Sequence, residues 1–450
     1  VYLFDTNDVD SGEVIIEYAG EGTDVIGIVT ATNFVNMPPT SFDEIEEIRF
    51  VGSNQTATFL GTQLTGETIV LTETGAGTSH LVITVASGGT VELQNITAST
   101  FSSGSDTITI AAAGGNETIT GPDIASIISG GGGNDTIEGR SGADSLMGGA
   151  GNDLYLFNTN NVTAGESITE NPGDGTDVVA LLTSTDFSLM SSSSFDEIEE
   201  IRFAGAEITG IFTGSQLTGE TINLTETVVG TSTLVINVQS GTTASFLNLT
   251  ANTFTSGTDI ISINGTNGSE NITGPNLVTT INGGFGLDTI SAGIVDDTIN
   301  GGPHADTLKG GRGDDVYLFN TNDVESGESI TEYAGEGTDV VSILTTTDFS
   351  TMSSNSLNEI EEIRFAGANQ TGTFTGAQLT GKALNLAETE SGTSNLIINV
   401  GSGTTTTFTN LTASTFFSGL DIITINGTTG NETITGPNLS TTINGGDGDD

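Results

Sequence analysis

Aspartate residues recur at nine-residue intervals within glycine-rich stretches of this 450-residue chain. Carboxylate and carbonyl oxygens are the ligands of hard cations, and Ca²⁺ takes about six to eight of them in a loose geometry. The residue types and the spacing therefore predict calcium sites. The carboxylates that we assign to them are Asp135, Asp144, Asp153, Asp288, Asp297, Asp306, Asp315 and Asp450.

Glycines surround each of these aspartates, as in GGGGNDTIE at 130–138 and GGRGDDVYL at 310–318. Glycine adopts positive φ angles without steric cost, so six residues of each nonapeptide can form a tight turn. The last three residues read as a short strand that turns one apolar side chain, such as Ile137 or Tyr155, into a thin core. We expect the metal loops to include Gly131, Gly133, Gly149, Gly151, Gly284, Gly286, Gly311, Gly313, Gly446 and Gly448.

Two nonapeptides complete one coil, so loops on one side of the chain recur every 18 residues. This register predicts three stacked pairs, which are Asp135 with Asp153, Asp288 with Asp306, and Asp297 with Asp315. Asp144 is expected on the opposite side. The first nonapeptides of each stretch carry glutamate or no carboxylate at this position, and we expect hydrogen bonds, not metal, to close their coils.

Each repeat unit also contains one isolated Gly-x-Gly-x-Asp turn near its start. These turns are AGEGTDVI (19–26), PGDGTDVV (172–179) and AGEGTDVV (334–341). Its aspartates, Asp24, Asp177 and Asp339, are further candidate ligands. An ordinary glycine turn is the alternative, because a single turn of this kind carries little information.

The consecutive nonapeptides resemble the calcium-binding repeats of RTX (repeats-in-toxin) proteins. This resemblance implies parallel β-rolls, Ca²⁺ as the cofactor, and passage of the unfolded chain through a type I secretion channel before folding outside. The protein is accordingly expected to be secreted and extracellular, at a bacterial cell surface.

The chain as a whole is expected to be all-β, a parallel β-roll or β-helix solenoid of three repeat units with calcium-binding nonapeptide tails. The string EIEEIRF occurs once in each unit, at 44–50, 197–203 and 359–365. We expect solenoid-like blocks at 1–111, 157–264 and 319–426, and β-roll tails at 112–156, 265–318 and 427–450, the last one cut short. A β-sandwich is the alternative fold for the blocks.

Within the blocks, EIEEIRF reads better as a strand than as a helical turn. Its arginines, Arg49, Arg202 and Arg364, are expected to pair with neighbouring glutamates. The terminal GGDGDD followed by Val1-Tyr2-Leu3 would spell one more nonapeptide. We therefore expect the chain to be one period of a longer array.

The composition excludes several functions. The chain has 58 acidic against 7 basic residues, a formal charge of −51. Phosphate recognition requires a basic surface, so nucleic acid is not an expected partner. Membrane insertion is not expected either, because no apolar run has the length of a transmembrane helix. With no Cys, two His and no catalytic motif, the chain is not expected to be an enzyme.

These features predict a calcium-stabilised extracellular structural protein that folds on binding Ca²⁺ after secretion. A surface layer, sheath, filament or adhesin stalk would suit it, with self-association into a polymer or array. Two alternatives remain, namely a calcium-binding segment of a secreted RTX enzyme or toxin whose active domain lies elsewhere, and a ligand-binding adhesin.

Overall fold

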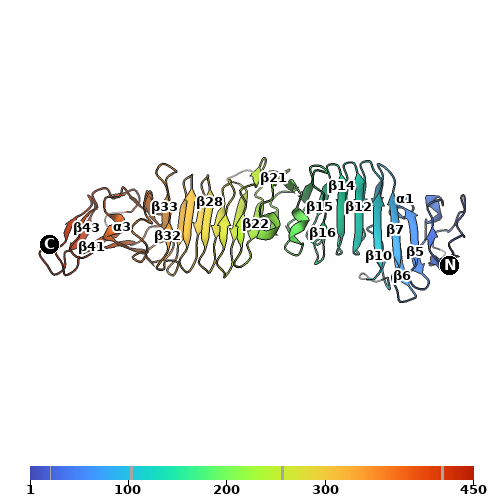
Figure 1. The fold of residues 1–450 in the computed structure, drawn as a ribbon, viewed down its shortest axis with the longest axis horizontal. Coiled ribbons are helices and arrows are strands. Elements are labelled where there is room, and N and C mark those ends of the chain that lie inside the picture. The colour runs from blue at the N-terminus through green and yellow to red at the C-terminus, as the bar shows by residue number, and fades with distance from the viewer. Residues whose placement is uncertain (21, 102–104, 255–257, 417–419) are drawn as a thin grey trace. The chain divides into compact units, whose positions relative to one another are not determined.

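The computed structural model describes residues 1–450 except 21, 102–104, 255–257 and 417–419 (Figure 1). Its strands pair in parallel, coil upon coil, as an all-β solenoid. Helix is limited to single turns, α1 (Gly61–Leu64), α2 (Gly214–Leu217), α3 (Gly376–Leu379), η1 (Pro39–Ser41) and η2 (Ser192–Phe195). Within the part of the chain that is described, none of these turns has the length needed to cross a lipid bilayer.

The chain divides into two compact units. The first comprises Val1–Phe212, Glu220–Thr233 and Ala251–Thr255, and the second comprises Thr213–Gly219, Leu234–Thr250 and Ser256–Asp450. The strands β20 (Thr209–Thr213), β22 (Thr233–Asn237) and β24 (Thr250–Ala251) include residues of both units.

Three parallel sheets build the first unit, and β18 (Thr185–Asp186) pairs with β20. One sheet contains β1 (Tyr2–Phe4), β2 (Val25–Ile28), β4 (Glu47–Phe50), β6 (Ile69–Glu73) and β9 (Ile96–Ala98). A second contains β3 (Thr32–Asn33), β5 (Thr56–Leu60), β7 (His80–Val85), β10 (Thr107–Ala112), β12 (Ser126–Gly132), β14 (Ser145–Ala150) and β16 (Ser167–Ile168). A third contains β8 (Thr90–Glu92), β11 (Thr118–Thr120), β13 (Thr136–Glu138), β15 (Leu154–Phe157), β17 (Val178–Leu181), β19 (Glu200–Phe203) and β21 (Asn223–Glu226).

The second unit repeats this arrangement. β22 is followed in one sheet by β25 (Ile260–Asn264), β27 (Thr280–Asn282), β29 (Thr298–Asn300), β31 (Val316–Phe319), β33 (Val340–Ile343), β35 (Glu362–Phe365), β37 (Asn385–Glu388) and β40 (Thr412–Ala413). Another contains β23 (Thr243–Ser245), β26 (Asn271–Thr273), β28 (Thr289–Gly293), β30 (Thr307–Gly311) and β32 (Ser329–Ile330). The remaining strands are β34 (Thr347–Asp348), β36 (Thr371–Thr375), β38 (Asn395–Asn399), β41 (Ile422–Asn426) and β43 (Thr441–Asn444) in one sheet, and β39 (Thr405–Thr407) with β42 (Thr433–Thr435) in another.

Coil length distinguishes the glycine-rich tails from the blocks. Hydrogen bonds between neighbouring coils join residues 18 apart in the tails, for example Asp135 and Asp153. In the blocks the corresponding bonds join residues 22 to 29 apart. The blocks are therefore wider turns of the same parallel solenoid, and the β-sandwich alternative is wrong, because a sandwich is built from antiparallel sheets.

The core consists of columns of apolar side chains that run along the solenoid, and each coil contributes one side chain to a column. In the first unit the column runs through Ile119, Ile137, Tyr155, Val179 and Ile201, which are in register across β11, β13, β15, β17 and β19. All five side chains are buried. Alternation of apolar and polar residues along each strand directs one side chain inward and its neighbours to solvent, which is why Ile and Thr dominate these strands.

EIEEIRF forms a strand in each copy, as expected, with β4, β19 and β35 covering its last four residues. The predicted pairing of the arginines is also confirmed. Arg49, Arg202 and Arg364 each place Nε 2.7 Å from an Oε1 atom of the glutamate two residues earlier. These pairs lie on the solvent side of the strands, and their contribution to stability is small.

Each block contains one helical turn, α1, α2 or α3, that ends in Gln-Leu. Gln378 of α3 is fully buried. Its Nε2 donates to the carbonyl oxygens of Phe349, at 2.7 Å, and Met352, at 3.1 Å, and its Oε1 accepts from the Thr375 N–H at 2.7 Å. One side chain thus satisfies three backbone groups of the coil interior.

Replacing Gln378 by leucine should lower the free energy of unfolding by about 2–4 kcal/mol, because it leaves buried donors and acceptors without partners. Urea denaturation followed by far-UV circular dichroism at constant calcium would measure the loss. Gln370→Leu is the matched control, since Gln370 is half-buried and its side chain donates to only the Ala368 carbonyl. Equal losses in the two variants would contradict the assigned role.

Candidate metal centre

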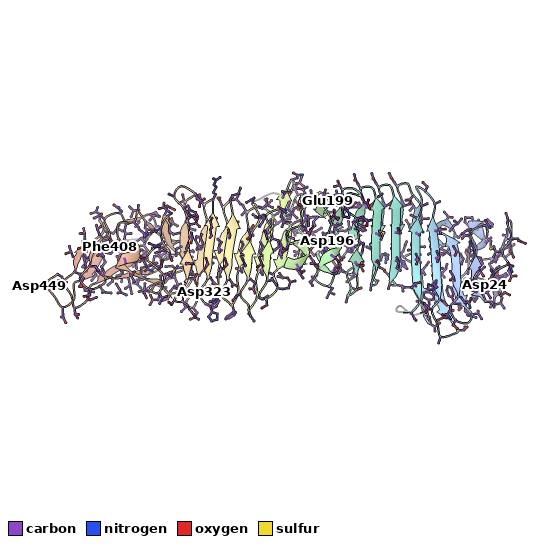
Figure 2. The ribbon with its side chains drawn as sticks, viewed as in Figure 1. Asp24, Asp196, Glu199, Asp323, Phe408 and Asp449 are labelled. Atoms are coloured by element: carbon purple, nitrogen blue, oxygen red, sulfur yellow. The ribbon has the colours of Figure 1, made fainter. Side chains whose placement is uncertain are left out.

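The carboxylates at the sixth position of the nonapeptides form hydrogen-bonded ladders along the solenoid. In the first unit, Asp135 Oδ1 accepts from the Glu117 N–H, and Asp153 Oδ1 accepts from the Asp135 N–H, both at 2.7 Å. The ladder continues through Asp177 Oδ1, 2.8 Å from the Asp153 nitrogen, to Glu199 Oε2, 2.7 Å from the Asp177 nitrogen. Glu199 is labelled in Figure 2. The 18-residue pairing of Asp135 with Asp153 is therefore found in the structure.

A second ladder of the first unit precedes the strands of another sheet. Asp144 Oδ1 accepts from the Ser126 N–H at 2.7 Å and from its hydroxyl at 2.9 Å. The Asp144 N–H in turn donates to Glu166 Oε2 at 3.0 Å. Asp144 precedes β14, whereas Asp135 and Asp153 precede β13 and β15, so it lies on the other side of the coil, as predicted.

The second unit has the same two ladders. Asp288 N–H donates to Asp306 Oδ1 at 2.7 Å, and Asp306 N–H donates to Glu328 Oε2 at 2.8 Å. In the other ladder, Asp297 N–H donates to Asp315 Oδ1 at 2.7 Å. Asp315 N–H then donates to Asp339 Oδ1 at 3.0 Å. Both predicted pairs are therefore found here as well.

In the buried nonapeptide aspartates, one carboxylate oxygen accepts a ladder hydrogen bond and the other is buried without one. Among the described residues, the second oxygen has no hydrogen-bond partner in seven aspartates, which are Asp135, Asp144, Asp153, Asp288, Asp297, Asp306 and Asp315. All seven are almost completely buried. A buried polar atom without a partner is costly, and a row of them in a net-negative chain calls for a cation.

The glycines leave room for these oxygens. The carboxylate of Asp153 lies against the Cα of Gly148, where a Cβ would come within 2.3 Å of Oδ2. At Gly133 a Cβ would lie 1.4 Å from the Gly115 carbonyl oxygen of the preceding coil. Positive φ angles occur at every glycine that the sequence assigned to the metal loops, that is Gly131, Gly133, Gly149, Gly151, Gly284, Gly286, Gly311, Gly313, Gly446 and Gly448.

Burial raises the pKa of the seven buried nonapeptide aspartates. The pKa rises to about 6 for Asp153 and Asp288. It rises to about 7 for Asp144, Asp306 and Asp315 and to about 8 for Asp297, and it is also raised for Asp135. The cause is desolvation, which disfavours the charged form when no cation is present.

The candidates from the lone turns fall into two groups. Asp177 and Asp339 are buried ladder members, and burial raises the pKa of each to about 7. Asp24 is half-buried, and its N–H donates to Glu46 Oε2 at 2.6 Å. Asp450 is exposed, and its Oδ1 accepts from the Glu432 N–H at 2.9 Å.

Sequence reasoning missed the glutamates that extend the ladders. Glu166 and Glu328 are buried, and desolvation raises the pKa of each to about 9. Glu170 and Glu332 join the aspartates of the lone turns in two clusters. In these clusters, Asp153–Glu170–Asp177 and Asp315–Glu332–Asp339, one carboxylate oxygen from each residue lies within 4.8 Å of the others. The recurring Gly-Glu-Ser-Ile-Thr-Glu, at 165–170 and 327–332, was the available signal.

The donor set fits Ca²⁺. The candidate side-chain ligands are carboxylates, and their unpartnered oxygens are buried beside the glycines of the turns. Hard oxygen ligands in a flexible loop select Ca²⁺ over softer metals. When bound, the ion would supply positive charge and coordination, while the ladders hold the carboxylates at fixed spacing.

A family model for the RTX calcium-binding nonapeptide repeat matches the chain in four copies, within residues 125–155 and 282–317. No curated protein gives a significant match. The matched ranges include every nonapeptide aspartate predicted as a ligand except Asp450. The chain thus carries RTX calcium-binding repeats within a parallel β-solenoid, and Ca²⁺ is the ion expected there.

These pKa values predict opposite pH dependence with and without calcium. A folded-state pKa above the ordinary value of about 4 means that the metal-free folded chain holds more protons than the unfolded chain. Its stability is therefore greatest at low pH and is lost as the pH rises through about 6 to 9. In chelator, the chain should therefore keep more β structure at pH 5 than at pH 8, where it should be largely unfolded, and its thermal midpoint should be lower at pH 8 than at pH 5.

Calcium should reverse this order, because the ion binds the deprotonated carboxylates and competes with protons for them. Thermal unfolding by far-UV circular dichroism, at both pH values and with either chelator or millimolar CaCl₂, is the measurement. A midpoint in chelator that rises with pH would contradict the burial of uncompensated carboxylates.

Proposed function

We propose that this chain, which carries RTX calcium-binding nonapeptide repeats, is a calcium-stabilised extracellular structural segment that folds on binding Ca²⁺ after secretion. The observation that supports it best is the row of buried, unpartnered carboxylate oxygens in the ladders of both units. The ligand assignments, including those of Asp24, Asp177, Asp339, Asp450 and the loop glycines, are part of this proposal.

Metal binding is coupled to folding by electrostatics. Without cations, aspartates stacked coil upon coil repel one another, and the formal charge of −51 favours an expanded chain. Each Ca²⁺ adds two positive charges between neighbouring coils. Because the sites do not exist in the unfolded chain, the free energy of metal binding contributes directly to folding.

The expected affinity explains why such a chain would fold outside the cell. Extracellular calcium modules bind with dissociation constants of about 10⁻⁴–10⁻³ M. A chain with such sites remains unfolded at low cytosolic calcium, which suits export through a narrow channel. It then becomes rigid in a calcium-rich exterior, where RTX repeat proteins typically act.

The repetitive construction of the coils supports a structural role. The coils are built from repeated short strands, buried apolar columns and carboxylate ladders, and hydrogen bonds join each coil to the next. Repeats stacked in this way form an extended body whose length grows with the number of coils. A surface layer, sheath, filament or adhesin stalk is therefore the proposed setting, with self-association into an array.

Calcium titration from a chelated start should give a cooperative gain of β-sheet signal by far-UV circular dichroism near about 10⁻⁴–10⁻³ M. The double variant Asp288→Asn/Asp306→Asn should shift the midpoint to higher calcium. Asparagine keeps an oxygen that can accept the ladder N–H but removes the charge and the second ligand oxygen.

The matched control is Asp186→Asn/Asp348→Asn, which removes the same charge from two exposed aspartates. Their Oδ1 atoms accept only local N–H groups, from Ser188 and Ser350, at 2.9 Å. This control should titrate like the native chain. A β spectrum that ignores both calcium and chelator would reject the proposal.

Self-association should depend on the same ion, because Ca²⁺ neutralises the charge that keeps acidic chains apart. Sedimentation velocity should detect species larger than one chain in millimolar CaCl₂ and a single expanded chain in chelator. A monomer under both conditions at high protein concentration would argue against an array and leave calcium-dependent folding intact.

A further inference from the structure

Two three-carboxylate clusters lie where a glycine-rich tail meets the next block. Asp153 precedes β15, Glu170 follows β16 and Asp177 precedes β17. The second cluster is built in the same way from Asp315 before β31, Glu332 after β32 and Asp339 before β33. All six carboxylates are at least nine-tenths buried, and the oxygens of each cluster lie within 4.8 Å of one another.

Unpartnered oxygens point to a ligand in these clusters. Asp153 Oδ2, Asp315 Oδ2 and Glu332 Oε2 are buried without a hydrogen-bond partner among the described residues. The other oxygens of the aspartates are engaged, since Asp153 Oδ1 accepts from the Asp135 N–H and Asp315 Oδ1 from the Asp297 N–H. The hydrogen bonds to Oδ1 therefore fix the orientation of each aspartate carboxylate, and with it the position of the unpartnered Oδ2.

The glutamates are oriented by donors from the tail. Gly148 N–H donates to Glu170 Oε1 at 2.9 Å, and the Tyr155 hydroxyl donates to the same oxygen. Gly310 and Tyr317 hold Glu332 in the same way. Tyr2 donates to Glu17 Oε1 at 2.5 Å, so the contact between tyrosine and glutamate is also present in the first repeat unit.

Three carboxylates this close cannot all be ionised in a buried site unless a cation balances them, because like charges at this separation repel strongly in a low dielectric. Hydrogen bonding already occupies one side of each cluster. In the first cluster Glu170 Oε2 also accepts from the Gly149 N–H, at 3.3 Å. One oxygen from each of the three carboxylates still lies within 4.8 Å of the others, and all are hard donors, which suits a divalent ion such as Ca²⁺.

We propose that each cluster is a calcium site at the end of a tail, which shares the aspartate of the last nonapeptide and adds Glu170 or Glu332 as a ligand from outside the RTX repeats. This inference rests on the proposed calcium-dependent fold and adds a second class of site to it. With three carboxylates, the site should bind more tightly than loops that share two, since ligand charge tunes calcium affinity.

An ion in this site would contact carboxylates of both the last coil of the tail and the first coil of the block, and would hold the two coils together. In the first unit, the segment that connects β15 to β17 is longer than a nonapeptide. It contains β16, and Glu170 follows that strand. An ion held by Asp153, Glu170 and Asp177 ties both ends and the middle of that segment together. The junction is therefore ordered before or together with the weaker ladder sites.

The test uses the full chain and the double variant Glu170→Gln/Glu332→Gln. Glutamine keeps an oxygen that can accept from the glycine N–H and the tyrosine hydroxyl, so the local fold should persist. Calcium titration against a chromophoric chelator should show a loss of about two of the tightest-bound ions per chain, one for each cluster. The control Asp186→Asn/Asp348→Asn should lose none.

A second readout uses the tyrosines, because the chain has no Trp and the hydroxyls of Tyr155 and Tyr317 contact the proposed ligands. Tb³⁺ in place of Ca²⁺ should give tyrosine-sensitised luminescence at the lowest metal additions. The glutamine variant should lose that first phase. Tyr155→Phe/Tyr317→Phe in the chain with native glutamates should also lose it, which tests the site even where the glutamine variant does not fold.

The outcomes separate the two proposals. A native chain that binds no calcium overturns the proposed function and this site together. A native chain that folds on calcium, with the same number of tight ions and the same early Tb³⁺ signal in the glutamine variant, overturns the junction site alone. Loss of about two tight ions and of the early signal, with β structure regained at saturating calcium, supports it.

Discussion

The hydrogen bond from the backbone N–H of one coil to the carboxylate of the next is the contact on which this structure depends. It fixes the stacking of coils, because each aspartate must lie directly over the equivalent residue of the coil before it. It also places a carboxylate inside the solenoid. Once one oxygen is bound to the backbone, the other is buried with it and needs a cation.

The same contact explains how coils of different width can join. The ladder passes from the 18-residue coils of a tail into the wider coils of a block without interruption, since Asp153 is followed by Asp177 and then by Glu199. What changes is the length of chain between ladder positions. The wider coils also bury aromatic side chains, and Phe34 stacks on Phe59 with ring centroids 4.7 Å apart.

The acidity and the high glycine content of the chain are linked, because the buried carboxylates need the turns and the space that glycine provides. Glycine provides the left-handed turns and the space beside each carboxylate, but it supplies no apolar surface and costs conformational entropy on folding. A thin core of one apolar side chain per short strand leaves little to offset that cost. Under the proposed function, Ca²⁺ between the coils would supply the missing stabilisation, and folding would then depend on the calcium concentration as well as on the sequence.

The sequence by itself determined the register of the tails. In a solenoid, contacts join residues at a fixed separation, so the nine-residue period led directly to the stacking of Asp135 with Asp153 and of Asp297 with Asp315. Only the tertiary structure decided that the blocks are wider coils and not a sandwich, because apolar alternation is the same in both folds. It alone brought Glu170 and Glu332 to the aspartates, since they lie on an excursion outside the nine-residue period and their proximity arises from how that excursion folds back.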